Sequence, residues 1–460
     1  MKCLRKSTHH YYVIYKHKST RLFMRTGSSV TTAGYFITKG VKNYTLTMPV
    51  AESNEEELNP SWMDKIFFEK ALQSSENDPF LTVTSVQIER ATVPGDNYLS
   101  AMYRATIQIV KGDKTEERSL IVKTEPTGQA MNKLAADGNV FEREVTMFRD
   151  VIPAMNRLIE EILPGKCQPF AAKYVYSCNG PHKSTIILED LKKKGFKMAE
   201  RTTGLDMDHC LLVMRTLARF HAASVALKDR SPELLEPFMT SEVLDTMEND
   251  FQDVISSMYT NIAKEVKNWP EYGEKYYNKI LKVAPVSAKK YVEGRRRDEN
   301  DFNVLSHGDL WINNMMFAYS EDNNSPLDLR FVDYQISYWA TPAIDIHYFL
   351  ESSTCNDLLD KTHILVEEYY QTLEETLTLF GYQHLLPPWE EFNNQLNKRG
   401  AFARNCVFSI HCGALADRNN IPDMNKVINE GEAFYCSHIY MESLKTLLPL
   451  LDAKGWLEVH

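Results

Sequence analysis

The sequence lacks long apolar runs, paired cysteines and repeats. No apolar stretch of this 460-residue chain approaches the roughly 20 residues that a membrane-spanning helix requires, so no membrane span is expected. The eight cysteines, from Cys3 to Cys436, include no C-x-x-C pair and no framework spacing, which predicts buried or incidental reduced thiols in a reducing compartment. We find no internal repeat and no low-complexity tract. A composition of 43% hydrophobic and 25% charged residues is typical of an ordinary globular protein.

Acidic residues are absent from the first 47 positions, which hold nine lysines or arginines. Because the whole chain has a formal net charge of −10, the remainder from Met48 carries −19, which is nine charges more negative. An acidic body of this kind argues against nucleic acid as the main partner.

The basic N-terminal segment has two interpretations. It is rich in Ser and Thr and free of acid, which matches a mitochondrial transit peptide in composition, but its amphipathic periodicity is poor. The alternative is a disordered extension, or an upstream start that precedes a natural start at Met48. We expect residues 1–58 to be a disordered extension and the protein to be cytoplasmic, with mitochondrial import as the minor alternative.

The rest of the chain is long enough for two lobes. Alternating apolar and polar residues predict three strands, at Leu81–Arg90, Tyr103–Val110 and Ser119–Lys123. A helix of about 138–151 follows, and the second half of the chain is mainly helical in pattern. These elements predict an α+β fold, with a β-rich N-terminal lobe at 59–190 and a mainly α-helical C-terminal lobe at 191–460.

The most informative segment reads L-S-H-G-D-L-W-I-N-N at residues 305–314, and V-D-Y-Q follows at 332–335. His-Gly-Asp alone occurs by chance as a turn, but here an Asn stands five residues after Asp309, and a second Asp follows a strand-like run. Phosphoryl transfer from ATP requires an Asp that accepts the proton of the attacking hydroxyl, and an Asn and a second Asp that bind magnesium. Asp309 is therefore the candidate base. Asn314 and Asp333 are the candidate metal ligands, brought together by a hairpin predicted between them.

Lys123 and Glu144 are candidates for holding the nucleotide phosphates. Lys123 ends a predicted strand, and Glu144 lies at the edge of the apolar stripe of the next helix. A carboxylate in that position needs a cationic partner, and Lys123 would provide it while orienting the α- and β-phosphates. The alternatives are an ordinary strand-edge lysine and a solvated helix glutamate beside Arg143.

Two further segments are candidates for nucleotide contacts. One is the segment 189–191 at the end of a predicted strand, where the backbone between the lobes would bind the edge of the adenine ring. The other is the turn P-G-D-N-Y at 94–98, because the chain has no G-x-G-x-x-G loop. The candidate cofactor-binding residues are Gly95, Asp96, Asn97, Lys123, Glu189, Asp190 and Leu191. The chain also lacks an A-P-E motif after Asp333, which argues against a protein substrate.

Several strings occur together between roughly Asn59 and Leu350, namely PGDNYLSAMYR, IVKTEP, FEREVTMF, ILEDL, LARFHAAS, LSHGDLWINNMMF, VDYQ and TPAIDIHYFL. In these strings and their order the chain resembles the ecdysteroid kinase-like family, a branch of the choline/aminoglycoside kinase superfamily. The resemblance implies a bilobal protein-kinase-like fold, with ATP and Mg²⁺ as cofactors. It also implies phosphorylation of a hydroxyl on an ecdysteroid or another lipophilic small molecule, including a dietary toxin. We expect a monomer.

The resemblance also bears on supporting residues. Asp345 resembles the Asp that braces the catalytic-loop backbone in kinases, and His221 is expected to be satisfied in the core. The basic run Arg295–Arg297 is expected to be a solvated helix end. The aromatic-bearing positions near the motifs are each expected to be core rather than substrate contacts: Trp311, Tyr338, Trp339, Phe402, Phe408 and His411.

Three alternatives to an ecdysteroid kinase stay open. A choline- or ethanolamine-type kinase would need an aromatic cage for its cationic substrate, whereas a steroid needs a large apolar cavity, and the sequence does not decide between them. A catalytically silent nucleotide- or ligand-binding protein is the second alternative, and the presence of all five candidate residues argues against it. A metal-dependent phosphohydrolase using His307 would leave the Lys123–Glu144 pair unexplained.

Overall fold

The computed structural model describes residues 60–91, 100–125, 139–179, 184–240, 242–321, 325–417 and 436–459, and the backbone of five short strands within residues 5–31. For residues 242–251 it describes the backbone alone. The chain forms two compact units, residues 1–57 and residues 58–460. Each unit is taken by itself.

The first unit contains two small antiparallel strand groups. The strands are Arg5–Lys6 (β1), paired with His9–His10 (β2), and Tyr12–Lys16 (β3), Ser19–Thr26 (β4) and Ser29–Thr31 (β5), in the order β3-β4-β5. The β-branched and aromatic residues of this segment are in keeping with strands. The disordered extension expected over residues 1–58 stays a prediction, and so does the alternative of a transit peptide.

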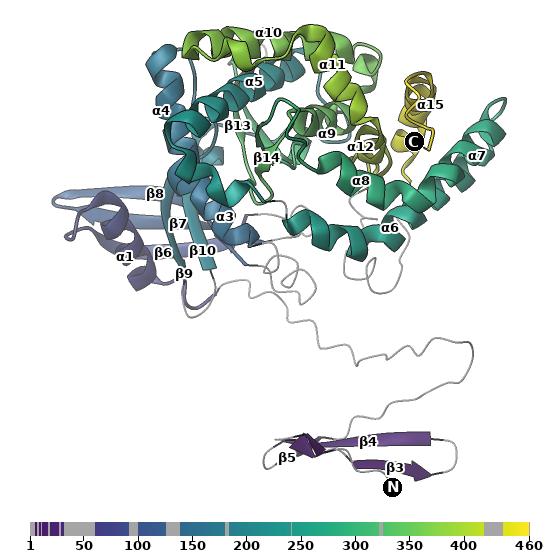
Figure 1. Ribbon diagram of the computed structural model, residues 1–460. Helices are drawn as coiled ribbons and strands as arrows, with labels where there is room; N and C mark the ends of the chain where they lie inside the picture. Colours follow the sequence, from purple (N-terminus) through teal and green to yellow (C-terminus); the bar gives the residue numbers. More distant parts are fainter. Residues whose placement is uncertain are drawn as a thin grey trace. The chain divides into compact units, whose positions relative to one another are not determined.

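Five antiparallel strands form the sheet of the N-terminal lobe, in the order β6-β7-β8-β10-β9 (Figure 1). Their bounds are Thr82–Arg90 (β6), Ala101–Lys111 (β7), Lys114–Thr124 (β8), Tyr174–Asn179 (β9) and Ser184–Glu189 (β10). Helix α1, Lys65–Glu76, contacts β6 and β9 and is capped by Asp64, whose carboxylate accepts the Phe67 N–H over 2.8 Å. The three strands predicted from the sequence correspond to β6, β7 and β8.

The two faces of this sheet have different roles. Alternate residues of β7 are buried and share a core cluster with Phe68 and Leu72 of α1. Each large side chain buried in this way contributes about 1.5–3 kcal/mol, so α1 holds this face in place. In β8, Val122 belongs to the α1 face. Its neighbour Lys123 therefore points to the opposite face, because successive side chains of a strand alternate.

The helix predicted at about 138–151 continues further than expected. Helix α3 (Val140–Thr146), a π-helical turn (η1, Met147–Val151) and α4 (Ile152–Ile162) follow one another without a break. Pro153 does not end the run, because it follows the π-helical turn directly, and the altered hydrogen bonding of that turn accommodates a residue without an N–H. In that π-helical turn the backbone hydrogen bonds span five residues instead of the four of an α-helix.

The C-terminal lobe consists mainly of helices (Figure 1). The principal ones are α5 (Met207–Arg230), α6 (Glu242–Lys267), α7 (Gly273–Val283), α8 (Ser287–Arg295), α9 (Ala343–Ser353), α10 (Thr362–Phe380), α11 (Trp389–Lys398), α12 (Gly400–Asn405), a π-helical turn (η8, Cys406–His411), α13 (Cys412–Ala414) and α15 (His438–Ala453). The predicted α+β fold, with a β-rich N-terminal lobe and a mainly α-helical C-terminal lobe, is confirmed.

Helix α5 is the core helix of this lobe and packs against α4 and α10. Among the described residues it is also the one helix long and apolar enough to cross a membrane by length and composition. However, 72% of its apolar window is buried inside the protein, as expected for a core helix. His221 lies in α5 and is fully buried there, as the sequence predicted.

Two short strand pairs lie within the helical lobe. Val304–Ser306 (β11) pairs with Tyr338–Ala340 (β14), and Met315–Tyr319 (β12) pairs with Pro326–Phe331 (β13), both antiparallel. The second pair is the predicted hairpin, and its register sets Met315 opposite Phe331. The residues just before β12 and just after β13 therefore lie side by side.

Arg295 corrects the sequence prediction of a solvated helix end. The last residue of α8, it is only 1% exposed. Its guanidinium donates to the Gly308 carbonyl over 2.9 Å and to the Tyr291 hydroxyl over 2.6 Å, and it lies over the rings of Tyr291 and Tyr338. These oxygen atoms and aromatic faces replace water around the charge, and that is why the arginine is buried without a carboxylate. Arg296 is exposed, as expected.

Candidate active site

The backbone of the loop His307–Asp309 is held by a buried carboxylate. Asp345, in the first turn of α9, accepts the His307 N–H over 2.6 Å and the Gly308 N–H over 2.8 Å. His221 contacts the same carboxylate over 3.0 Å and is itself held by the Tyr369 hydroxyl over 2.7 Å. Burial opposes ionisation of Asp345, but the hydrogen bonds from His221 and the loop backbone keep its pKa below the ordinary value. The structure thus places Asp345 where the sequence predicted a brace.

Gly308 is the one residue of this loop that must be glycine. Its φ of +84° lies in the left-handed region, which side chains with a Cβ rarely adopt. A Cβ at this position would also lie 2.4 Å from the carbonyl oxygen of Ile336. The close approach lets the loop pass directly over the segment that precedes β14.

Asp309, the candidate base, follows this glycine and is half-buried. Its Oδ1 accepts a hydrogen bond from the Tyr348 hydroxyl, and its Oδ2 accepts one from Asn314 Nδ2 over 2.8 Å. Burial raises the pKa of Asp309, the Tyr348 hydrogen bond opposes that rise, and the nearby Asp333 adds to it. The carboxylate is therefore fixed at both oxygens and is a stronger base than a solvated Asp.

His307 contributes to the loop structure. Its Nδ1 accepts the Asp309 N–H over 3.3 Å, and its Nε2 lies 3.0 Å from the Val332 carbonyl oxygen. The contact to Val332 ties the loop to the residue next to Asp333.

Asn314 and Asp333 lie together at the open end of the β12–β13 hairpin. The Val332 N–H donates to the Asn314 carbonyl over 3.0 Å, which continues the hairpin pairing. The Asn314 side-chain nitrogen donates to the Asp309 carbonyl over 2.8 Å, so its amide oxygen points away from that contact. Asp333 has a φ of +68°, an uncommon value for a residue with a Cβ. This backbone conformation turns its carboxylate toward Lys123.

These two residues fit a magnesium ion. An amide oxygen and a carboxylate are hard oxygen ligands, and Mg²⁺ takes few protein ligands and keeps substrate phosphate and water as the rest. Glu144 and Asp333 outnumber Lys123, the cation between them, which leaves an excess of negative charge in this cluster for a metal ion to balance. Among the described residues no group of three or more His, Cys, Asp or Glu is arranged to hold a metal.

Lys123 lies at the centre of a buried ion cluster. Its ammonium is 2.7 Å from Glu144 of α3 and 2.9 Å from Asp333. Burial lowers the pKa of Lys123, but Asp333 and Glu144 outweigh burial and raise it. Burial raises the pKa of Glu144 to about 7, against the lowering effect of Lys123. Gln335 fits the same cluster, with its amide nitrogen 3.3 Å from Asp333 and its amide oxygen 3.2 Å from Lys123.

A cavity of about 380 Å³ opens beside this cluster. It is lined by apolar side chains, among them Met102, Ile121, Phe148, Leu188, Phe196 and Met316, and by Lys123, Glu144, Asn314 and Asp333. An apolar cleft that ends in charged groups suits a nucleotide, whose base is flat and whose phosphates are anionic. Glu189, Asp190 and Leu191, predicted from the sequence, also line it.

The predicted hinge residues are held by the neighbouring strands. Asp190 accepts from Arg104 of β7 over 2.7 Å and from Ser119 of β8 over 2.6 Å, and it caps the next turn through the Lys192 N–H over 3.1 Å. Glu189 accepts the Lys173 N–H over 2.8 Å. Because both side chains are engaged in the protein, a ligand here would contact backbone groups, as the sequence predicted. Gly95, Asp96 and Asn97 lie outside the described residues, and their contribution stays a prediction.

Sequence reasoning missed three residues that contact the predicted site. Tyr348 donates to Asp309, Gln335 meets Lys123 and Asp333, and Arg295 donates to the carbonyl of Gly308. For Gln335 the V-D-Y-Q string was a usable signal, since the glutamine stands two residues after Asp333. Tyr348 stands three residues after Asp345, on the same face of a helix, which was a weaker signal. Nothing in the local sequence distinguishes Arg295 from Arg296.

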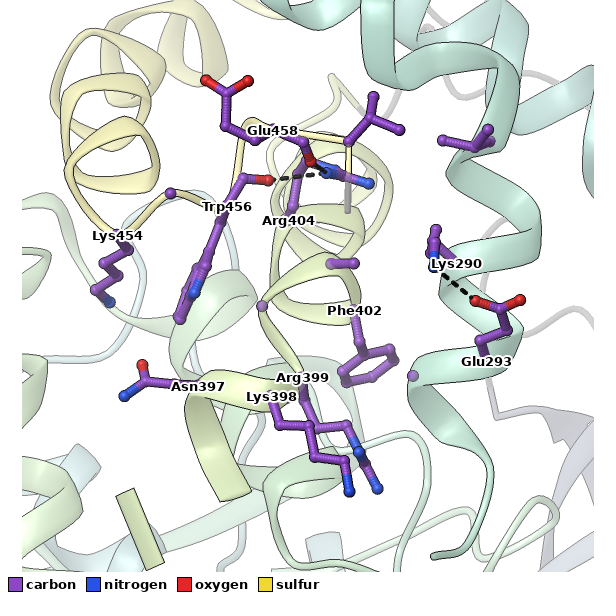
Figure 2. A pocket seen from close by; sticks show the side chains of 16 residues that line it. Lys290, Glu293, Asn397, Lys398, Arg399, Phe402, Arg404, Lys454, Trp456 and Glu458 are labelled. Atoms are coloured by element: carbon purple, nitrogen blue, oxygen red, sulfur yellow. Dashed lines mark hydrogen bonds and ion pairs between the residues drawn. The ribbon is translucent and has the colours of Figure 1, made fainter. Parts of the chain in front are cut away.

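A second cavity, of about 400 Å³, is lined by α8, the junction of α11 and α12, and the C-terminal turn (Figure 2). Its basic side chains are engaged with the protein: Arg404 donates to the Trp456 carbonyl over 2.8 Å, and Lys290 pairs with Glu293 over 2.9 Å. Phe402 borders this cavity, and its ring also packs near Tyr348, with centroids 6.4 Å apart. The cavity contains none of the candidate catalytic residues.

Comparison with known proteins gives one family. Residues 94–382, more than half of the chain, match the model of the ecdysteroid kinase-like family. No curated protein matches. Solved structures with similarity include an ethanolamine kinase of Plasmodium vivax (13% identity, TM-score 0.38, covering 85% of this chain and 89% of that one). They also include a mutant aminoglycoside 2'-phosphotransferase-IIIa in a GDP complex (12% identity, TM-score 0.39, covering 85% and 97%). Because the family model matches more than half of the chain, the chain belongs to the ecdysteroid kinase-like family.

Proposed function

We propose that this protein transfers the γ-phosphate of ATP to a hydroxyl group of a small lipophilic molecule of the ecdysteroid class. One observation carries the proposal: the chain brings Lys123, Glu144, Asp309, Asn314 and Asp333 together from four separate segments of the sequence. A structural ion pair alone would not need Asp309 and Asn314, and a loop motif alone would not need the buried Lys123–Glu144 pair.

Each residue has a distinct part in this proposal. Lys123, fixed by Glu144, binds and orients the α- and β-phosphates of the nucleotide in the adjoining cavity. Asn314 and Asp333 would hold Mg²⁺, which would supply positive charge to neutralise the phosphates. Asp309 orients the acceptor hydroxyl and takes its proton. The apolar lining of the cavity, with backbone groups at 189–191, would receive the base.

The acceptor is proposed from the family alone. The short path from Asp333 to α9 leaves no segment of the kind that binds protein substrates, which favours a small molecule. A choline-type acceptor would instead require an aromatic cage around its quaternary ammonium group.

The test is transfer of γ-labelled phosphate from ATP to a panel of free hydroxyl compounds, with ecdysteroids beside choline and ethanolamine. Wild type and Asp309→Asn are assayed together, because the amide keeps the shape of the carboxylate but takes no proton. A labelled ecdysteroid formed by wild type alone supports the proposal. Labelling of choline or ethanolamine instead would show that the acceptor is not an ecdysteroid. Magnesium-dependent ATP binding without any labelled product would favour a silent binder.

A further inference from the structure

Tyr348 is the one side-chain hydroxyl that contacts the candidate base among the described residues. It donates to Asp309 Oδ1, while Asn314 donates to Oδ2 over 2.8 Å. A carboxylate accepts at two lone pairs on each oxygen, so both oxygens keep room for one further donor. The carboxylate cannot turn about its Cβ–Cγ bond without breaking one of these two contacts.

The position of Tyr348 follows from the helix that carries it. Asp345 and Tyr348 are three residues apart in α9 and therefore share a face. Asp345 holds the backbone of His307 and Gly308, and Tyr348 holds the side chain of the next residue, Asp309. One rigid helix thus fixes both the path of the loop and the direction of its carboxylate.

Tyr348 is itself held firmly. Its side chain is buried, and its ring lies near Phe402 of α12 at 6.4 Å between centroids. Figure 2 shows Phe402 beside the cavity that borders α8 and the C-terminal turn. Burial and the adjacent Asp309 raise the pKa of the Tyr348 phenol well above its ordinary value, so the hydroxyl remains a donor.

We propose that Tyr348 is a positioning residue for phosphoryl transfer, which aims the free lone pair of Asp309 at the acceptor hydroxyl. This inference rests on the proposed function. In the transfer step the acceptor O–H bond breaks and its oxygen bonds to the γ-phosphorus. The bond from that phosphorus to the β–γ bridging oxygen breaks, ADP leaves, and the proton passes to Asp309. Tyr348 keeps its own proton throughout and transfers nothing.

The same geometry restricts the acceptor. With Tyr348 on one oxygen and Asn314 on the other, a third donor reaches Asp309 only through the one free lone pair that each oxygen keeps. An acceptor hydroxyl therefore has to approach Asp309 at one of these two free positions. Removing the phenol oxygen would release the carboxylate and relax this restriction.

The experiment compares Tyr348→Phe with Tyr259→Phe in the phosphate-transfer assay. Tyr259 is an equally buried tyrosine in a different core cluster, whose hydroxyl donates to Asn405 over 2.9 Å, so its loss matches the general cost of one buried hydrogen bond. We expect Tyr348→Phe to lower kcat about ten- to one-hundredfold, the range for losing a supporting contact, with an unchanged KM for ATP. Tyr259→Phe should leave kcat unchanged.

A second measurement does not depend on turnover. Crystal structures of wild type and Tyr348→Phe should show the Asp309 carboxylate turned away from its wild-type direction in the variant. Equal kcat for Tyr348→Phe and wild type, equal losses in both variants, or an unmoved carboxylate would overturn the inference. If wild type transfers phosphate to no acceptor, the proposed function fails, and the crystal comparison still decides whether Tyr348 positions Asp309.

Discussion

The ammonium of Lys123 lies 2.7 Å from the carboxylate of Glu144, with both side chains almost completely buried. Taking two charges out of water is costly, and their attraction offsets that cost only at close range. The pair also crosses from the sheet to the first helix, because Lys123 is in β8 and Glu144 in α3. The position of this helix therefore decides whether Lys123 is held in place for the nucleotide.

Glu144→Gln should weaken nucleotide binding. The amide keeps the shape of Glu144 but loses the charge that holds Lys123, which would then be paired with Asp333 alone. We expect the Kd for MgATP to rise about tenfold or more, as calorimetric titration can measure. Glu142→Gln, on the same helix but half-exposed, is the control and should bind as wild type does. Equal Kd values for all three proteins would contradict the role of the pair.

Asp333→Asn should remove the magnesium dependence of nucleotide binding. Asparagine tolerates the left-handed backbone at this position, where φ is +68°, so the change isolates the charge from backbone strain. Binding measured with and without Mg²⁺ should differ strongly in wild type and little in the variant. Asp328→Asn, which alters a carboxylate paired with Arg330 in β13, serves as the control and should keep the wild-type difference.

Gly308→Ala should destabilise the protein and abolish transfer. An added Cβ would meet the Ile336 carbonyl oxygen at 2.4 Å, on a backbone with φ of +84°. Strain of this kind costs about 1–3 kcal/mol, and here it would move the loop that carries Asp309. Gly413→Ala is the matched control, because a Cβ there meets nothing within 4 Å. Thermal unfolding of both variants gives the comparison. A melting temperature of Gly308→Ala equal to that of wild type would show that a side chain is tolerated at this position.

Local sequence patterns predicted the parts of the site that depend on short-range structure. The hairpin that brings Asn314 to Asp333 follows from two apolar runs around a polar turn, and the structure contains this hairpin as β12 and β13. The direction of Lys123 follows from strand alternation. These features need only the periodicity of neighbouring residues, and that is why the sequence was sufficient for them.

The residues that sequence reasoning missed depend on contacts between distant elements. Tyr348 reaches Asp309 only because α9 packs behind the loop, 39 residues later in the chain. Arg295 is buried because two tyrosines and a backbone carbonyl surround it, although its local sequence is three consecutive arginines. A run of charged residues usually indicates exposure to solvent. Tertiary packing nevertheless buries Arg295, the first of these three arginines.

His411 should make the protein less stable as the pH falls below neutral. Burial lowers the pKa of His411 to about 4, from an ordinary value of 6.5. The unfolded chain therefore binds a proton below about pH 6.5, whereas the folded protein binds it only below about pH 4. Stability is lost across this window, by roughly 3 kcal/mol at its lower end. Glu144 acts in the opposite direction, because its raised pKa removes stability as the pH rises from 4.5 to about 7.

His411→Gln isolates the effect of this histidine from that of Glu144. The imidazole of His411 contacts Ser443 over 2.9 Å, and glutamine can replace that contact without titrating. Between pH 7.5 and pH 5 the melting temperature should therefore fall less in His411→Gln than in wild type. His438→Gln is the control, because His438 is 88% exposed and should leave the pH dependence as it is. A variant that loses stability with pH as steeply as wild type would show that His411 is not the titrating group.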